Sequence, residues 1–534
     1  MANRKMFANA KKSLPVANTV NRAGGKAYSV SDENALAQYA TTCTFNGTYY
    51  AGPEQILDEV KKMIAGCSDD FLIKTALYSR KVGKLKDMPA YILAELTARQ
   101  NIPGLELHFS EIINNTKMLR NYVQIVRSGV TSRKSFGSGP KRVLQQWLVN
   151  TDVDRLFYDS VGDNPSLGAI IKLVHPKPKN KKQEALFGWL IGKEVSKRNM
   201  PALLKSFEDF KSGNTTEIPA VDFRRLTSLE LNTEQWKQIG YAAGWNMIRM
   251  NLNTFARHGC FADKAFTRFV AEKLSSEDEI RKALVFPYQL FTTYCNIENV
   301  PVEIKNALQQ AIEFATRNTP VYNGNVVVCV DTSGSMTSPI TGSRGTATTK
   351  MKCVDVASLI ASSILRTNKN SLVLPFDTRV HVIDINPFDS VTTNTGKLSR
   401  SGGGTDCSCA LRYLNQMQYN ADLVIYVSDN ESWYNEHKSS IRSYSSSNIV
   451  IEWANFKKRN AKAKLACIDI QPGRTVMAPS NKDVLNIGGF SDNVLNVIAN
   501  FQNNATGDFA QIIKDWYANR ENLKNALDSE EEEC

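Results

Sequence analysis

Five side chains in three separate stretches carry oxygen atoms of the kind that hard metal ions bind. The apolar, β-branched run NVVVCV is followed directly by Asp331, Ser333 and Ser335. The stretch SGGGTDCS supplies Thr405 beside three glycines, which let the backbone come close, and VIYVSDNES supplies Asp429. Ordinary core packing does not call for so many oxygens after a strand. This ligand set suits Mg²⁺, which requires near-octahedral geometry and keeps some of its waters.

These side chains can share one ion if the strands before them are parallel neighbours. The runs NVVVCVD, SLVLPFD, ADLVIYVSD and AKLACIDIQ are short and nearly continuously apolar, as expected for parallel strands buried on both faces. Helical patterns such as MKCVDVASLIASSILRTN and CALRYLNQM separate them. This alternation predicts a doubly wound, Rossmann-like α/β domain. Ligands of such domains bind beyond the carboxyl ends of the strands, where the strand order reverses.

The chain before about residue 320 has a different pattern, with one amphipathic helix after another. In PEQILDEVKKMIAG the apolar residues recur at helical spacing between a first-turn proline and a terminal glycine. We also predict single helices over SEIINNTKMLRNYVQIVRSG and NTEQWKQIGYAAGWNMIRMNLNTFARHG. Strand-like alternation is nearly absent. Many helices with short connections fit an α-solenoid of stacked pairs, although no fixed-period repeat is visible.

The positive charge lies entirely in this helical part. Residues 1–320 hold 44 Lys and Arg against 31 Asp and Glu, whereas residues 321–534 hold 21 against 22. Two windows contain no acid at all. The window between Glu111 and Asp152 carries Lys117, Arg120, Arg127, Arg133, Lys134, Lys141 and Arg142, and the window between Asp163 and Glu184 carries Lys172, His175, Lys177, Lys179, Lys181 and Lys182. One charge run is usually a solvated face, but two close together favour a polyanion-binding surface.

Composition argues against several other classes of protein. No apolar run approaches the roughly 20 residues that span a bilayer, so we predict no membrane segment. The basic N-terminus lacks the apolar region of a secretory signal, which predicts a cytoplasmic protein, with a mitochondrial presequence as the alternative. The ten cysteines are scattered without a C-x-x-C pair, which indicates reduced thiols rather than structural zinc. Cys407 and Cys409 are predicted to be small buried hydrophobes rather than a redox pair.

No catalytic constellation is visible. A phosphatase that forms an aspartyl phosphate would need a second aspartate where Ser333 stands, and no phosphate-cradling G-x-x-x-x-G-K-[ST] loop occurs. None of the five histidines are at ligand spacing to one another. We therefore predict that the protein is not an enzyme.

The D-x-S-x-S loop, the glycine-rich loop threonine and the strand-end aspartate together resemble the metal-ion-dependent adhesion site (MIDAS) of von Willebrand factor A (vWA) domains. The resemblance implies that Ser333, Ser335 and Thr405 hold Mg²⁺ directly. Asp331 and Asp429 would act directly or through water, and an oxygen from a ligand would complete the shell.

The whole chain resembles the Ro autoantigen ribonucleoprotein family, which joins a telomerase, Ro and vault (TROVE) module to a vWA domain; a bacterial-type member is one reading. The resembling stretches are NGTYY, GSGPKRVLQQW, IIKLVHPKP, FPYQL, GGGTDCS, VSDNES and GGFSDNVLNVIANF. The resemblance implies a multidomain α plus α/β protein. A ring-shaped α-helical, HEAT-like repeat domain over residues 1–320 would precede a vWA domain over 321–505 and an acidic extension over 506–534.

The resemblance also implies a function in non-coding RNA quality control. The central hole of the ring would take the ends of misfolded RNAs, and small structured Y-like RNAs would bind the basic outer surface. The resemblance implies a monomer, with an exoribonuclease as a further partner. His175 would act as a donor or stacking surface. The candidate RNA contacts are Lys117, Arg120, Arg127, Arg133, Lys134, Lys141, Arg142, Lys172, His175 and Lys177.

One departure from the family and two rival functions stay open. Animal members carry further basic residues shortly before the histidine, whereas this chain has none from 156 to 171, so Y-RNA binding is less secure than RNA binding in general. The first rival is a scaffold protein whose MIDAS grips a carboxylate of a protein partner. The second is an RNA-processing enzyme.

Overall fold

Two compact units make up the chain. The computed structural model describes residues 14–42, 45, 51–283, 285, 287–340, 350–400, 402–433, 447–490, 493–503 and 506–532. The sheet unit comprises residues 1–63, 286–288 and 315–512, and the helical unit comprises 64–285, 289–314 and 513–534. The stretch NGTYY, which contributed to the family resemblance, lies outside the described residues.

These boundaries differ from the predicted domains 1–320, 321–505 and 506–534 at both ends of the chain. The N-terminal segment belongs to the sheet unit rather than to the helical one, and most of the C-terminal segment belongs to the helical unit. Contacts between segments far apart in the sequence decide both assignments, and local patterns do not report them.

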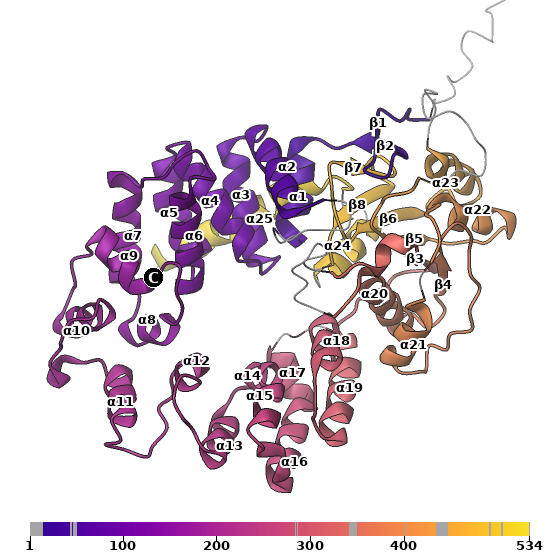
Figure 1. The fold of residues 1–534 in the computed structure, drawn as a ribbon. Coiled ribbons are helices and arrows are strands. Elements are labelled where there is room, and N and C mark those ends of the chain that lie inside the picture. The colour runs from indigo at the N-terminus through magenta and orange to yellow at the C-terminus, as the bar shows by residue number, and fades with distance from the viewer. Residues whose placement is uncertain are drawn as a thin grey trace, which may run out of the picture. The chain divides into compact units, whose positions relative to one another are not determined.

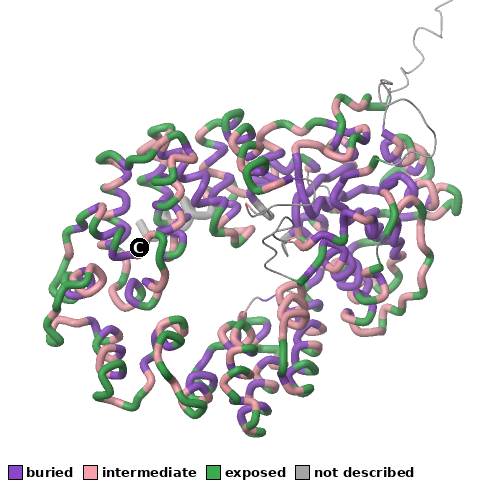
Figure 2. Tube along the Cα trace, viewed as in Figure 1, coloured by how far each residue is buried: buried purple, intermediate pink, exposed green. Residues whose placement is uncertain are grey.

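A five-stranded parallel sheet is the centre of the sheet unit (Figure 1). Its strands lie in the order β4-β3-β5-β6-β8. Their bounds are β3 (Val326–Asp331), β4 (Leu372–Phe376), β5 (Leu423–Ser428), β6 (Lys464–Asp469) and β8 (Val484–Gly488). Every residue of β3, β5, β6 and β8 is buried, as the purple strands of Figure 2 show. The predicted doubly wound domain is confirmed.

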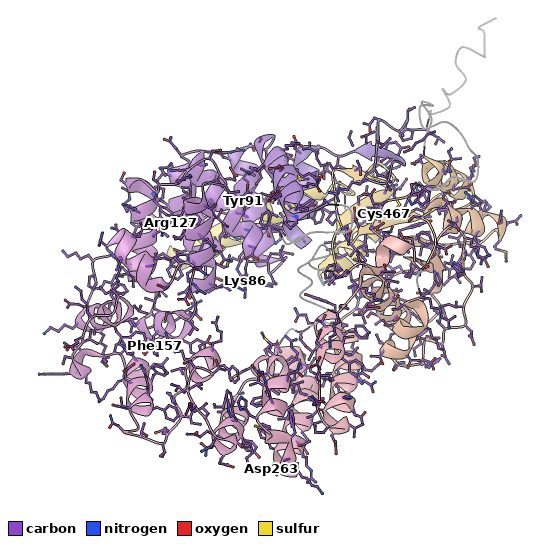
Figure 3. All side chains as sticks on the ribbon, viewed as in Figure 1. Lys86, Tyr91, Arg127, Phe157, Asp263 and Cys467 are labelled. Atoms are coloured by element: carbon purple, nitrogen blue, oxygen red, sulfur yellow. The ribbon has the colours of Figure 1, made fainter. Side chains whose placement is uncertain are left out.

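Helices cover both faces of this sheet. They are η3 (Gly334–Thr337), α20 (Cys353–Thr367), α21 (Val391–Leu398), α22 (Ser408–Gln416), α23 (Asn448–Arg459) and α24 (Asn493–Gln502). Residues of α22 and α23 pack with Val327, Cys329, Tyr426 and Cys467 in one hydrophobic cluster (Cys467 is labelled in Figure 3). α20 and α24 contact the same sheet but contribute no residue to that cluster, so they cover the opposite face.

The N-terminal segment adds a small second sheet to this unit. It contains β1 (Thr19–Val20), β2 (Lys26–Ser29), α1 (Asp32–Thr42) and most of α2 (Pro53–Ala65). β2 pairs with β1 and with β7 (Thr475–Val476), both antiparallel, and Arg474 forms an ion pair with Asp32. The expectation that the first 320 residues are almost free of strands is therefore too simple. Strands of two and four residues are too short to produce a visible period.

The helical unit is a succession of short helices (Figure 1). Its elements begin with α3 (Asp69–Lys81), α4 (Asp87–Ala98), α5 (Ile102–Ile112), α6 (Thr116–Ser128), α7 (Ser138–Asn150), α8 (Val153–Asp159), α9 (Leu167–Val174), α10 (Lys181–Leu190), η1 (Lys197–Asn199), α11 (Ala202–Lys211) and α12 (Phe223–Leu226). They continue with α13 (Thr233–Ala242), α14 (Trp245–Met250), α15 (Leu252–Arg257), η2 (Cys260–Ala262), α16 (Lys264–Leu274), α17 (Glu277–Ala283), α18 (Pro287–Asn296) and α19 (Val302–Thr316).

Two predicted long helices are broken in the structure. The stretch SEIINNTKMLRNYVQIVRSG divides because the Asn115 side chain accepts from the Met118 amide at 3.0 Å and so starts a new helix, α6. The stretch NTEQWKQIGYAAGWNMIRMNLNTFARHG divides into three helices. Gly244 is extended there, and Asn251 lies between α14 and α15. Helical spacing continues across such breaks, so periodicity alone does not detect them.

The C-terminal helix α25 (Phe509–Glu532) corrects the prediction of a solvated acidic extension over residues 506–534. The ring of Trp516 meets Tyr78 of α3 edge-on, with 5.2 Å between centroids. Arg520 forms an ion pair with Glu111, and Lys514 lies over the ring of Phe71. The acidic residues that suggested a free tail are at its very end, whereas the preceding turns carry the aromatic and basic side chains that pack.

None of the helices in the described ranges has the length and apolarity to cross a bilayer. Cys407 and Cys409 are buried free thiols, as predicted, and burial raises the pKa of both.

Candidate metal centre and nucleic-acid interface

The five candidate metal ligands follow the carboxyl ends of the central strands. Asp331 is the last residue of β3, and Asp429 follows the last residue of β5. β3 and β5 are neighbours in register, and the chain leaves β3 toward one edge of the sheet through β4 and continues from β5 toward the other. The candidate ligands therefore lie at the switch point of the sheet, where α/β domains of this type bind ligands.

Hydrogen bonds hold the first loop in a fixed shape. The Ser333 amide donates to Asp331 Oδ1 at 2.8 Å, and Ser428 Oγ donates to Asp331 Oδ2 at 2.6 Å. The hydroxyl oxygens of Ser333 and Ser335 are 3.3 Å apart. The Asp331 and Ser333 side chains are fully buried, so their oxygens are shielded from bulk water.

The glycine-rich loop before Thr405 is tied to this first loop. The Gly402 amide donates to the Thr332 carbonyl at 2.9 Å, and the Gly334 amide donates to the Gly403 carbonyl at 3.0 Å. A Cβ atom on Gly334 would lie only 3.3 Å from the Gly403 carbonyl oxygen, which explains the small residue there. Thr405 is buried in this loop pair.

Four carboxyl groups are buried at this edge of the sheet: Asp331, Asp429, Glu431 and Asp469. Burial, followed by repulsion from Asp429, raises the pKa of Asp331 to about 7. Burial also raises the pKa of Asp429, against hydrogen bonds from Ser335 and the Glu431 amide, and Asp429 Oδ2 is buried without a hydrogen-bond partner among the described residues. Burial likewise raises the pKa of Glu431 to about 7 and that of Asp469 well above its ordinary value. Such a site favours a cation.

The chemistry of the donor set fits a hard cation. Among the described residues, no three His, Cys, Asp or Glu side chains are grouped to hold a metal, so any bound ion needs the hydroxyl oxygens as well. Two carboxylates with three hydroxyls are a donor set for Mg²⁺ rather than for zinc.

The N-terminal hairpin covers the loop after β5, which sequence reasoning missed. The Asn21 side chain donates to the Ser432 carbonyl at 2.9 Å, and the Ala23 amide donates to Glu431 Oε2 at 3.0 Å. Burial disfavours the charge of Arg22, but Tyr39, Glu59 and Glu431 outweigh it and raise the pKa of Arg22. Because these contacts join residues about 400 positions apart, no local signal could have revealed them.

In the helical unit, the fold brings the two acid-free windows together. Helices α6 and α7 come from the first window, and α9 comes from the second and contacts both. The Gln145 side chain of α7 donates to the Val174 carbonyl at the end of α9, at 2.6 Å. His175 follows in a left-handed conformation with φ of 52° and with its side chain exposed.

A cavity of about 690 Å³ lies beside His175. Lys172, His175, Lys181 and Lys193 line it together with apolar side chains such as Phe187. Glu184 and Glu194 also line it. Lysines around an apolar floor offer charge for a phosphate and a surface for a base or sugar.

The ten predicted RNA contacts differ in their exposure and bonding. Arg120 is only 7% exposed and packs against Gly162, and Arg133 donates to the backbone carbonyls of Thr97 at 3.0 Å and Phe136 at 2.9 Å. Arg142 is exposed but forms an ion pair with Glu106, and Lys141 is half-buried. The remaining six have exposed side chains: Lys117, Arg127 (Figure 3), Lys134, Lys172, His175 and Lys177. The structure therefore gives Arg120 and Arg133 structural contacts that leave them poorly placed for RNA.

A further basic group lies outside the two windows. Burial, and then repulsion from Lys117 and Arg80, lowers the pKa of Lys86. Arg80 is held by Asn114, whose side-chain oxygen accepts at 2.9 Å. Lys86 lies outside the two windows because it ends a shorter acid-free run, between Asp70 and Asp87.

Comparisons with known proteins agree on one family. The model of the Ro60 vWA domain matches residues 325–502. The RNA-binding protein RO60 of Deinococcus radiodurans is 23% identical over 519 residues, which cover 90% of this chain and 94% of that protein. The crystal structure of the Deinococcus radiodurans RO (RSR) protein superposes with a TM-score of 0.61 at 17% identity, covering 88% of this chain and 99% of that one. The last similarity is evidence of a shared fold.

Proposed function

Since the chain belongs to the Ro protein family, we propose that it is a non-catalytic RNA-binding protein whose helical unit holds the RNA. The similar protein from Deinococcus radiodurans is named an RNA-binding protein, which supports the proposal. The observation that carries it is the cavity of about 690 Å³ in which Lys172, His175, Lys181 and Lys193 meet an apolar floor.

The proposed RNA is non-coding. We infer that the ligands are the ends of misfolded RNAs and small structured, Y-like RNAs. The protein would hold them as a cytoplasmic monomer in RNA quality control. An exoribonuclease would be its protein partner. The central hole that the family resemblance implies stays a prediction. Exposed basic side chains support RNA as the ligand class, because phosphate contacts give affinity without sequence specificity.

The experiment replaces two lysines of the cavity, Lys172→Ala with Lys181→Ala, and measures binding of labelled single-stranded RNA by fluorescence anisotropy at several salt concentrations. Affinity should fall for all sequences alike, and the salt slope should become shallower by about one to two. The matched control is Lys264→Ala with Arg268→Ala, two exposed basic residues of α16. Equal losses in both variants would mean that the cavity has no special part in RNA binding.

We further propose that the switch-point residues of the sheet unit hold Mg²⁺. The fit rests on the buried, unpartnered Oδ2 of Asp429 and on two carboxylates with raised pKa values. Ser333, Ser335 and Thr405 would be direct ligands, with Asp331 and Asp429 direct or through water. The ion would supply a positive charge with an open position for an oxygen ligand, and the protein residues would orient it and exclude water.

Binding of the metal is tested by thermal unfolding during Mg²⁺ titration. Ser335→Ala should abolish the Mg²⁺-dependent rise in melting temperature, because it removes one proposed ligand. Thr337→Ala changes an exposed hydroxyl two positions further on and should keep the rise. A rise that survives in both variants would place the ion elsewhere.

The proposal of a non-catalytic protein has its own test. Labelled RNA incubated with the protein and Mg²⁺ should stay intact. Cleavage that disappears in Asp331→Ala would favour the RNA-processing enzyme instead.

A further inference from the structure

A cavity of about 1300 Å³ lies in the sheet unit at the edge where the parallel strands begin. Gly324, Asp422 and Asp483 line it, and each lies one or two residues before a strand, β3, β5 and β8 respectively. Lys464, the first residue of β6, lines it as well. Strands of five or six residues put this edge about 15 to 20 Å from the proposed metal ligands. The cavity is therefore a separate site.

Close backbone contacts fix the walls of this cavity. A Cβ atom on Gly507 would lie only 2.2 Å from the Asn481 carbonyl oxygen, so the stretch before α25 sits directly on the turn before β8. On another side, the Gln502 side chain donates to the Asn323 carbonyl at 2.7 Å and ties the end of α24 to the segment before β3. The lining is therefore preformed.

The lining is polar almost throughout. Among the described residues that line the cavity, only Gly324 and Ala461 lack a polar side chain, and none is aromatic. Sites for small molecules are usually lined mostly by apolar and aromatic side chains. This cavity therefore offers little to an aliphatic or aromatic ligand, and it favours one that forms hydrogen bonds over its whole surface.

Two lysines of the lining are available to bind an anion. Lys462 and Lys482 are exposed, and neither ammonium group has an ion pair or a hydrogen bond to any residue in the described ranges. They precede β6 and β8, which pair directly, so they approach the cavity from adjacent strand starts. The third lysine, Lys464, is already engaged, because its Nζ donates to the Phe501 carbonyl at 2.6 Å. Two free ammonium groups suit a phosphate.

Three carboxylates limit how much negative charge the cavity accepts. Asp483 forms an ion pair with Lys457 at 3.2 Å. Asp422 and Asp508 each accept a hydrogen bond from one backbone amide, at 2.8 and 3.1 Å, which leaves their charge in place. A ligand with many negative charges would be repelled by them. Their remaining oxygen lone pairs can accept from hydroxyl groups.

We propose that this sugar-phosphate cavity, defined by Lys462, Lys482, Asp422 and Asp508, binds a small phosphorylated sugar. The phosphate would lie between the two lysines, and hydroxyl groups of the sugar would donate to the two carboxylates. A strand of RNA fits less well, because its bases find no stacking platform and its successive phosphates would meet the carboxylates. The inference goes beyond the proposed binding of RNA and Mg²⁺ and depends on neither.

The test measures binding of a panel of triose, pentose and hexose phosphates to the full-length protein in EDTA by saturation-transfer NMR. At least one member should bind, and Lys462→Ala with Lys482→Ala should weaken its binding about ten-fold or more, because charge-assisted hydrogen bonds are lost. Both side chains are exposed, so the variant should melt at the same temperature as wild type. The matched control is Lys62→Ala with Lys369→Ala, two exposed lysines of the sheet unit outside the cavity, and it should change the affinity less than about two-fold.

Further measurements separate a sugar phosphate from a simple anion. The parent sugar and inorganic phosphate should each bind about ten-fold or more weakly than the sugar phosphate, because each makes only part of the contacts. Asp508→Asn keeps the oxygen that accepts the backbone amide but loses an acceptor for a hydroxyl group. It should weaken the sugar phosphate and leave inorganic phosphate at least as tightly bound.

Several outcomes overturn the proposal. They are the failure of every member of the panel to bind, an unchanged affinity in the lysine variant, and inorganic phosphate that binds as tightly as the best sugar phosphate. A loss of poly-uridine binding in the lysine variant but not in its control would also overturn it, since the cavity would then be part of an RNA surface.

Discussion

At the scale of single residues, the buried carboxylates after β3 and β5 destabilise the folded sheet unit when they are charged. Asp331 is fully buried, and burial together with Asp429 raises its pKa to about 7. An isolated buried charge destabilises a fold unless it is paired or bound to a cation. Only Arg22, through its interaction with Glu431 and Asp429, supplies a nearby positive charge among the described residues. The site therefore carries destabilisation that a bound cation would relieve.

The first prediction concerns the pH dependence of this cost. The folded-state pKa of Asp331, about 7, lies above its unfolded value of about 3.9, so the folded state binds the proton more tightly. Stability of the metal-free protein should therefore fall as pH rises from about 4 to about 7 and stay low above that. In EDTA at pH 8, Asp331→Asn should unfold at a higher denaturant concentration than wild type. Its free energy of unfolding should be larger by on the order of 2 to 4 kcal/mol.

In Mg²⁺ the wild type should be more stable than Asp331→Asn, because the ion stabilises the Asp331 carboxylate and binds an amide less tightly. The control is Asp384→Asn, at an exposed position. Its free energy of unfolding should equal that of wild type both in EDTA and in Mg²⁺. A variant that is less stable than wild type in EDTA at pH 8 would contradict the argument.

At the scale of elements, two segments at the ends of the chain complete units whose main parts lie elsewhere in the sequence. The β1–β2 hairpin pairs with β7 and holds the loop after β5 through Asn21 and Ala23. Helix α25 packs on α3 and α5 through Trp516 and Arg520. The β1–β2 hairpin and α25 thus both contact elements that are distant from them in the sequence. The metal loop is thus held in shape partly by the N-terminus.

The second prediction tests the hairpin contact. A Cβ atom on Gly25 would lie 1.8 Å from the Ser432 carbonyl oxygen, so Gly25→Ala must push the hairpin and the loop apart. It should destabilise the sheet unit by about 1 to 3 kcal/mol and weaken the Mg²⁺-dependent stabilisation, as measured by chemical denaturation. Gly396→Ala in α21 is the matched control. Nothing lies within 4 Å of its added carbon, and alanine should raise helix stability by up to about 1 kcal/mol.

The third prediction tests the packing of α25. Trp516→Ala removes a half-buried indole that meets Tyr78 edge-on, and it should destabilise the helical unit by about 1 to 3 kcal/mol in urea unfolding. Asn519→Ala, an exposed position of the same helix, should stay within about 0.5 kcal/mol of wild type. Equal stability of both variants would mean that the helix adds little to the unit.

At the scale of the whole molecule, the two proposed activities belong to different units. The basic cavity around His175 is built by residues 171–199 of the helical unit, and the metal loops are built by β3, β5 and the glycine-rich loop of the sheet unit. The residues that line the cavity all belong to the helical unit and the five proposed metal ligands all belong to the sheet unit, so we expect each site to keep its geometry when the other is altered.

The fourth prediction follows from this separation. Removing metal with EDTA should change the affinity for single-stranded poly-uridine by less than about 0.5 kcal/mol, since independent sites contribute additively. Poly-uridine is chosen because it lacks structure that Mg²⁺ could alter, and anisotropy titrations with and without EDTA provide the measurement. A ten-fold change, which equals about 1.4 kcal/mol, would show that the two units are coupled.

The sequence by itself determined four of the five parallel strands, all but β8, and the group of oxygen side chains at the switch point of the sheet. Four continuous apolar runs identify buried parallel strands, and a residue that follows such a strand, as Asp331 and Asp429 do, must lie at the carboxyl edge of the sheet. It also located the two acid-free basic windows, which both lie in the helical unit, although the basic surplus of residues 1–320 divides between the units because residues 1–63 belong to the sheet unit. These inferences held because each depends on neighbours in the sequence or on a topology that such neighbours dictate.

Only the tertiary structure decided how distant segments pair. It assigned Asn21 and Gly25 to the loop at Ser432, enclosed Arg120 beside Gly162, and used Arg133 to bind backbone carbonyls. A charge count treats every arginine alike, but burial and hydrogen bonding depend on which groups the fold brings within about 3 Å. Local periodicity contains no information about those partners, so the hairpin, the docking of α25 and the usable part of the basic surface appear only in three dimensions.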